Sequence, residues 1–468
     1  MVLHPIIADL FDQRKIDFHE STGVAWRRDQ VLTEGARLIE VDDALKEIFS
    51  ESQQGIDLLG NEADPVIGFQ VPNVQVALDG LAARGLPAQR NHVFFTHGGV
   101  TAHPILSGSP ILSGSPYMDD DGDWRVPHPG RTTAVPIEEP KEAWPDSAGH
   151  QVRVGVLDTG LETTTEEGPR KPSHKRLHNH VLIHSDWTTS STTGDENIDE
   201  DIANADKAAG DPYVDRAAGH GTFITGMIRR LAPSSIITAQ GTISSFGDGD
   251  DLSLSNAIAE MMAVPAEERP QIINMSFGGF TENDEPPIGI QSQIAHAMLL
   301  GPDNEYATDD DIVFVASAGN EGNCRPTWPA AFGDVIAVSA RTPQGMPAWW
   351  SNWGHWVNAC ATGVDIISTF LHFAADEDVK IPVPMPGDDA GTRSATDPDE
   401  PGVFYYPPQS FHGWASWSGT SFAAPKVTAA IVREIATTGV PARVAAHRVV
   451  HDYGLARMPW YGTVINME

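Results

Sequence analysis

Five strongly apolar runs between residues 152 and 340 constrain the fold of this chain more than any other feature of its sequence. They are nearly continuous rather than alternating, as expected for strands that are covered on both faces. The runs are Val152 to Asp158, Ser235 to Thr242, Gln271 to Phe277, Asp311 to Asn320 and Asp334 to Ala340. Helical periodicity separates them, over residues 222–231, 252–264 and 290–299. This alternation predicts an α/β fold with a doubly wound, mostly parallel sheet.

The first hundred residues show shorter runs that predict a small α+β unit. Extended stretches are expected at 23–34, 65–71 and 91–96, and amphipathic helices at 41–52 and 74–84. The next stretch is rich in Pro, Gly and Ser and repeats the hexapeptide ILSGSP, which is typical of a linker. We therefore expect an N-terminal unit over 1–100, a linker over 101–148, the main domain over 149–440 and a C-terminal extension over 441–468.

The charge of the chain excludes several classes of partner. Its 468 residues include 30 Lys+Arg and 64 Asp+Glu, a net charge of −34, so the surface repels phosphate backbones and anionic lipid. We expect no nucleic-acid partner. No apolar stretch reaches the roughly 18 residues of a membrane span, so we expect no membrane partner either. Acidic and basic residues interrupt the first 25 positions, which leaves no signal-peptide pattern and predicts a cytoplasmic protein.

Three short motifs place polar side chains at the ends of predicted elements. Asp158 closes the first apolar run, His220 lies in GHGT at the start of a predicted helix, and Ser421 lies in SGTS before another. In a parallel sheet, such positions meet at the carboxyl edge. An acid, an imidazole and a hydroxyl have the parts of a nucleophilic triad, in which serine attacks, histidine takes its proton and aspartate orients the imidazole.

These motifs resemble the signatures of the subtilisin-like serine proteases. The resemblance rests on DTG at Asp158, GHGT at His220 and SGTSFAAP around Ser421, in the chain order Asp, His, Ser. Two further matches are SAGNEG, which contains Asn320, and NMSFGG, which contains Ser276, Phe277 and Gly278. The resemblance implies a subtilisin-like fold. It also implies that the Asn320 amide donates to the oxyanion and that residues 276–278 bind substrate beside the S1 pocket.

The implied activity is that of a serine endopeptidase, which forms an acyl-enzyme on Ser421 and acts on protein or peptide substrates. Long insertions between Glu162 and Asp215 and after Thr369 predict a narrowed, selective site. A histidine base predicts a neutral pH optimum, in contrast to the acidic base of sedolisin-type peptidases. Two alternatives stay open: a latent, autoinhibited recognition protein that is activated by a trigger, and an esterase or peptide ligase that uses the same triad.

The N-terminal unit resembles the propeptides of this family, which implies a folding chaperone and an intramolecular inhibitor. In that case residues 97–148 hold a self-cleavage site or a tether. The alternative is a separate domain that recruits substrates.

No metal or cofactor is required by the implied chemistry. The acid-rich stretch 186–216 favours a solvated rim over a structural Ca²⁺ site, although Ca²⁺ remains an alternative. The histidines at 174, 178, 180 and 184 lack a second ligand group with zinc spacing. Cys324 and Cys360 are expected to be two thiols. Trp414 and Trp417 either shape the substrate site or serve only packing.

Overall fold

The computed structural model describes most of residues 11–467. The parts outside the description are residues 1–10, 20, 51, 53–54, 60–64, 97–116, 119–123, 126–132, 163–171, 179–180, 183–213, 300–310, 375–380, 383–404, 407–409, 455 and 468. Most of both predicted insertions, and most of the predicted linker, therefore lie outside the described residues.

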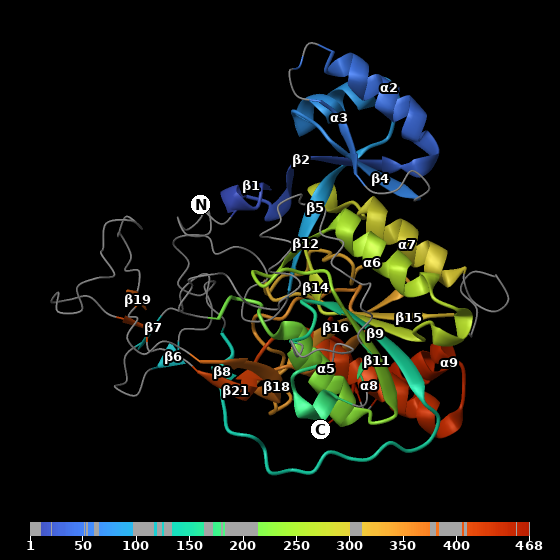
Figure 1. The fold of residues 1–468 in the computed structure, drawn as a ribbon. Helices are drawn as coiled ribbons and strands as arrows, with labels where there is room; N and C mark the ends of the chain where they lie inside the picture. Colours follow the sequence, from blue (N-terminus) through green and yellow to red (C-terminus); the bar gives the residue numbers. More distant parts are fainter. Residues whose placement is uncertain are drawn as a thin grey trace, which may run out of the picture.

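The centre of the main domain is a nine-stranded sheet in the order β10-β11-β9-β13-β15-β16-β17-β23-β22 (Figure 1). Its strands are β9 Val152–Asp158, β10 Val181–Leu182, β11 Ser235–Gly241, β13 Ile272–Met275, β15 Val313–Ser317, β16 Val335–Arg341, β17 Ala359–Thr362, β22 Arg457–Met458 and β23 Gly462–Val464. All neighbours run parallel except β22 and β23. The predicted α/β fold with a mostly parallel sheet is confirmed.

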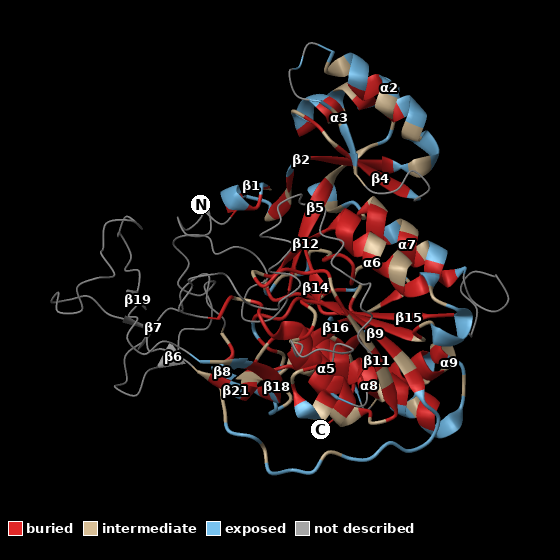
Figure 2. Cartoon of the chain, viewed as in Figure 1, coloured by how far each residue is buried: buried red, intermediate tan, exposed pale blue. Residues whose placement is uncertain are grey.

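Helices cover both faces of this sheet because alternate strand residues point in opposite directions. On one face, Val313 and Val315 pack in a cluster with residues of α5 His220–Leu231 and α8 Thr420–Thr438. On the other, Phe314 and Ala316 pack with residues of α6 Asp251–Ala263 and α7 Ile288–Met298. Both faces are thus apolar, which explains why the strands read as continuous apolar runs. Figure 2 shows the resulting burial along α5, α8 and the central strands.

The N-terminal unit is a twisted antiparallel sheet with two helices on one face. It comprises β1 Ile16–His19, β2 Val24–Glu34, η1 Gly35–Arg37, α2 Leu38–Ile48, β3 Asp57–Leu59, β4 Val66–Gln70, α3 Val74–Ala82 and β5 Gln89–Thr96. Val41 and Leu45 of α2 share a core with Ala77 and Leu81 of α3. The predicted strands and helices are present. Among the described residues of this unit, the pattern missed β1, η1 and β3, which are too short for a periodic signal.

The remaining elements are short. They are β6 Tyr117–Met118, β7 Trp124–Arg125, β8 Val135–Pro136, η2 Lys175–Leu177, β12 Asp248–Asp250, η3 Ala266–Glu268, β14 Phe277–Gly278, η4 Glu282–Asp284, β18 Ile366–Phe373, β19 Ile381–Pro382, β20 Tyr405–Tyr406, β21 Phe411–Trp417, α9 Ala442–His447 and η5 Arg448–Asp452. The C-terminal residues return to the main domain, since β23 joins its sheet and Ile465 is buried in its core. No helix in the described part of the chain combines the length and hydrophobicity needed to cross a membrane.

Candidate active site

Asp158 and His220 form a buried pair between β9 and α5. Asp158 is the last residue of β9 and His220 is the first residue of α5. The Oδ1 atom of Asp158 lies 2.8 Å from Nδ1 of His220. The backbone N–H of Thr159 donates to the same oxygen at 2.8 Å, which holds the carboxylate in place. A carboxylate in this position fixes the orientation of the imidazole ring.

The other ring nitrogen of His220, Nε2, is buried and makes no hydrogen bond to the described residues. The ring packs edge-on against Trp417, with centroids 5.4 Å apart, and lies 5.3 Å from the ring of Phe422. Because Phe422 follows Ser421, the imidazole lies beside the helical turn that holds the predicted nucleophile.

Two glycines allow His220 to come this close to β9. Gly219 has a φ of +76°, in the left-handed region, where a side chain is strained. A Cβ on Gly221 would lie 2.3 Å from the carbonyl oxygen of Gly160, which follows the aspartate strand. The glycines of GHGT therefore permit backbone contact between α5 and the turn after Asp158.

Ser421 lies in the first turn of α8 and is bound to Ser276. Its Oγ donates to the Ser276 carbonyl oxygen at 2.8 Å, while the Ser276 hydroxyl donates to the Ser421 carbonyl oxygen at 2.9 Å. The described hydrogen bond of the Ser421 hydroxyl thus goes to Ser276 rather than to His220. A hydroxyl rotates about its C–O bond, so its proton is not fixed on the Ser276 carbonyl.

Asn320 is bonded to Thr420, the residue that precedes the predicted nucleophile. Its Oδ1 accepts the backbone N–H of Thr420 at 3.0 Å and the Thr420 hydroxyl at 2.9 Å. With its oxygen held by Thr420, the amide presents its nitrogen in another direction. This is the orientation in which an asparagine can act as an N–H donor.

Sequence reasoning missed Asn352, which organises the loop that contains Asn320. The side chain of Asn352 accepts the backbone N–H groups of Glu321 at 3.0 Å and Asn323 at 3.2 Å, and donates to the carbonyl of Ala318 at 3.1 Å. It is completely buried. An asparagine in a tryptophan-rich connection gave no chemical motif that could have marked it.

The described structure places β5 of the N-terminal unit between two strands beside these residues. Phe95 pairs with both Asp248 of β12 and Gly278 of β14, and Thr96 pairs with Phe277. The Thr96 N–H also donates to the Gly247 carbonyl at 2.9 Å. Residues 277 and 278, predicted to bind substrate, therefore hydrogen-bond an extended segment of the same chain (Figure 1).

The side chain of Phe94 anchors this segment. It points away from Phe95 and is completely buried among core residues of the main domain, including Ile243, Leu254 and Phe277. Full burial of one such side chain stabilises by roughly 1.5–3 kcal/mol. As a result, β5 is held both by backbone hydrogen bonds and by an apolar side chain.

The other features predicted from the sequence have different outcomes. Among the described residues no group of three or more His, Cys, Asp and Glu is arranged to hold a metal ion. Residues 183–213, which include most of the acid-rich stretch, lie outside the description, as do His180 and His184. Cys324 and Cys360 are unbridged, as predicted, and burial raises the pKa of the Cys360 thiol to about 11. Trp417 contacts His220, whereas Trp414 packs against Trp144 and His174.

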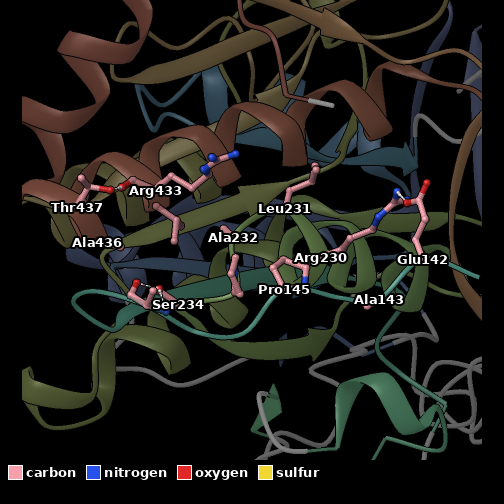
Figure 3. Close-up of a pocket in the computed structure, with 13 residues that line it drawn as sticks. Glu142, Ala143, Pro145, Arg230, Leu231, Ala232, Ser234, Arg433, Ala436 and Thr437 are labelled. Atoms are coloured by element: carbon pink, nitrogen blue, oxygen red, sulfur yellow. Dashed lines mark hydrogen bonds and ion pairs between the residues drawn. The ribbon is translucent and has the colours of Figure 1, made fainter.

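A separate pocket of about 420 Å³ lies at the far ends of α5 and α8 (Figure 3). Its lining includes Leu231, the last residue of α5, and Thr437 near the end of α8, and the ion pair of Arg230 with Glu142 borders it at 2.6 Å. Since α8 is about 28 Å long at 1.5 Å per residue, this pocket is remote from Ser421. It plays no part in the candidate site.

Comparison with known proteins agrees with this geometry. A family model described as the subtilase family matches residues 149–438. The chain belongs to the subtilase family. It is 27% identical over 271 residues to the minor extracellular protease Epr of Bacillus subtilis, covering 54% of this chain and 34% of that protein. It is 26% identical over 334 residues to an extracellular protease of Xanthomonas campestris, covering 65% and 48%.

Other similar proteins include thermitase of Thermoactinomyces vulgaris, 24% identical over 49% of this subtilase and 69% of thermitase. A crystal structure of a lanthipeptide protease superposes with a TM-score of 0.45 at 19% identity, covering 68% of this chain and 86% of that one. The chain spans about a third to a half of the length of the first curated relatives that it matches.

The prediction of a cytoplasmic protein is wrong. Relatives from Bacillus subtilis, Xanthomonas campestris and Dichelobacter nodosus are named extracellular proteases. The prediction rested on the absence of a signal-peptide pattern and of a membrane span, and neither absence identifies the compartment in which a protein acts.

Proposed function

We propose that this subtilase is a serine endopeptidase that hydrolyses peptide bonds through an acyl-enzyme on Ser421. The main supporting observation is the buried 2.8 Å contact of Asp158 with His220, beside the turn that holds Ser421. The relatives described above are named as proteases, which supports a hydrolase. The proposed chemistry uses only groups of the chain itself and requires no cofactor, and a structural Ca²⁺ stays the alternative to a solvated acidic rim.

In the proposed reaction, His220 Nε2 takes the Ser421 proton as the hydroxyl oxygen attacks the scissile carbonyl. Asp158 stabilises the resulting imidazolium, and the imidazolium then donates its proton to the leaving amine. A water molecule hydrolyses the acyl-enzyme by the same route in reverse. We assign the Asn320 amide and the Ser421 backbone N–H to the oxyanion, because both lie at the N-terminus of α8, where the helix dipole also favours negative charge.

The substrate would bind as an extended strand between β12 and β14. In this proposal, it takes the place and register of β5, with backbone hydrogen bonds to residues 277 and 278. Ser276 precedes the residue that pairs with Thr96, and its carbonyl oxygen lies 2.8 Å from the Ser421 hydroxyl. The cleaved bond would therefore follow the residue that lies opposite Ser276.

We further propose that the N-terminal unit is an intramolecular inhibitor. Its strand β5 occupies the position just assigned to the substrate, and the proposed catalytic residues His220 and Ser421 are completely buried in the chain that carries this unit. This favours residues 1–100 as an inhibitory unit over a recruiting domain, and 149–440 as the catalytic domain, with the family match over 149–438 in support. The linker and C-terminal boundaries stay predictions.

A fluorescent fluorophosphonate tests the nucleophile. In a Phe94→Ala chain, whose buried β5 anchor is removed, the site should be labelled, and adding Ser421→Ala should abolish labelling because the proposed nucleophile is gone. Ser418→Ala is a matched control, since this serine lies in the same motif but bonds the backbone of Asp365. In the same Phe94→Ala chain it should leave the labelling unchanged. Persistent labelling of the Ser421→Ala variant would assign the nucleophile elsewhere and refute the proposal.

A further inference from the structure

A buried charge cluster joins the N-terminal unit to β12. The Nε atom of Arg14 lies 2.6 Å from Oδ1 of Asp248, and Nη2 of Arg27 lies 3.2 Å from Oδ2 of the same residue. Nε of Arg27 also lies 2.9 Å from Oδ2 of Asp250. All four side chains are at most 5% exposed. Two guanidinium groups thus form ion pairs with two carboxylates of β12, a strand that we assign to substrate binding.

The cationic partners of these carboxylates come from the N-terminal unit alone. Within the described residues, the other contacts of Asp248 and Asp250 are neutral: Ser244, Ser253 and Asn91. Burying two carboxylates without counter-charges is strongly unfavourable. When the N-terminal unit leaves, the two aspartates lose both guanidinium groups and must be solvated or paired with another cation.

The strand register defines where a substrate would meet them. Asp248 lies opposite Phe95 and Asp250 lies opposite Val93, while Gly249 lies opposite Phe94. Directly opposed residues of antiparallel strands point to the same face. Residues 93 and 95 and both aspartates therefore share the face covered by the N-terminal unit, and Phe94 points into the catalytic core.

From this geometry we infer that Asp248 and Asp250 select substrates with basic side chains at the third and fifth residues before the cleaved bond. The inference rests on the proposed protease function and on the β5 register. A peptide in place of β5 puts its third residue opposite Asp248 and its fifth opposite Asp250. Arginine at these positions restores the pairing that Arg14 and Arg27 provide, whereas an acidic residue meets a like charge.

Matched peptides test this inference with the full chain and with its Phe94→Ala variant, whose anchor is weakened. The peptides repeat residues 91–100, with arginine or the uncharged isostere citrulline in place of Phe95, and a second pair carries these residues in place of Val93. We expect kcat/KM to be about tenfold higher for each arginine peptide. Asp248→Asn should bring the ratio for the Phe95 pair close to one, and Asp250→Asn the ratio for the Val93 pair.

Asp250→Asn keeps the cap of α6, and a charge change elsewhere on the surface serves as a control. Asparagine at 250 retains the oxygen that caps α6 by accepting the Ser253 N–H at 3.0 Å. Glu267→Gln removes one negative charge from an exposed position in η3 and should leave both ratios unchanged. A ratio of rates is unaffected by any general release of the N-terminal unit, because both peptides experience it equally.

The outcomes distinguish a failure of the proposed selectivity from a failure of the proposed protease function. Cleavage of all peptides with arginine and citrulline ratios near one would refute the selectivity and leave the protease proposal intact. Equal loss of the ratio in the Glu267→Gln variant would assign the preference to the net charge of −34 and refute a specific site. Absence of cleavage for every peptide and variant would refute the protease proposal, and the selectivity with it.

Discussion

At the scale of single residues, the site depends on hydrogen bonds that hold the proposed catalytic side chains in position. The Thr420 N–H donates to the oxygen of the Asn320 amide, and the Thr159 N–H donates to the Asp158 carboxylate that orients His220. The residue types and motif spacing predicted these side chains. The partners that orient them, such as Thr420 and Asn352, have no catalytic signature and emerge only from packing.

Replacement of Asn320 tests the assignment of the oxyanion donor. Asn320→Ala should retain the fold and lower kcat about a hundredfold to a thousandfold, the loss already established for such a donor within this family. KM should change little, because the interaction forms only in the transition state. Steady-state kinetics on a peptide substrate and a thermal melt check both parts. An unchanged kcat would remove Asn320 from the mechanism.

At the scale of elements, β5 is a strand of the N-terminal sheet that also pairs with two strands of the catalytic domain. The seven-stranded sheet in which it lies includes β12 and β14, so one continuous hydrogen-bonded surface joins the two units. Helix and strand positions in both units followed from periodicity. The pairing of β5 did not, because its own apolar pattern is the same whichever strands lie beside it.

Truncation of the β5 anchor should release the site. Phe94→Ala removes a completely buried ring, a change that costs about 3–5 kcal/mol in a packed core. Because the lost contacts join β5 to the catalytic domain, we expect peptide turnover by the full chain to rise at least tenfold. Val76→Ala, at a half-exposed position on α3 of the same unit, should behave as wild type.

The turnover assay also separates the open alternatives. A wild-type chain that already turns over as fast as the Phe94→Ala variant is a constitutive enzyme, and the inhibitory role of β5 is then wrong. A chain that cleaves no peptide in either form, yet is labelled at Ser421, fits an esterase or ligase better than an endopeptidase.

At the scale of the whole molecule, the two units are joined by buried ion pairs as well as by strands. Burial alone would raise the pKa of Asp248, but Arg14 and Arg27 outweigh it and hold the pKa below the ordinary value of 3.8. A carboxyl whose pKa is lowered in the docked state stabilises docking at pH values above 3.8. That contribution is lost as the pH falls below this value and the carboxyl is protonated.

Acid should therefore loosen the N-terminal unit in a way that depends on Asp248. We expect the Tm of the full chain to fall as the pH drops below 3.8, and Asp248→Asn to show a smaller fall over the same range. At pH 7 the variant should be about 3–5 kcal/mol less stable, since it leaves the buried Arg14 without its described counter-charge and leaves Arg27 paired with Asp250 alone. Thermal melts across this pH range measure both effects. Parallel curves for wild type and variant would show that Asp248 does not couple docking to pH.

The sequence alone determined the parallel sheet, the helices and the identities of the proposed catalytic residues. These depend on local information: apolar runs, helical periodicity, and glycines that permit close backbone approach next to His220. Only the tertiary structure decided what lies against the site. The ion pair of Arg27 with Asp250 joins residues 223 positions apart, and no local pattern specifies such a pairing. Strand partners and buried counter-charges are determined when the two units pack together. Polar and charged groups on each surface can leave water only when the other surface supplies their hydrogen-bond and ion-pair partners.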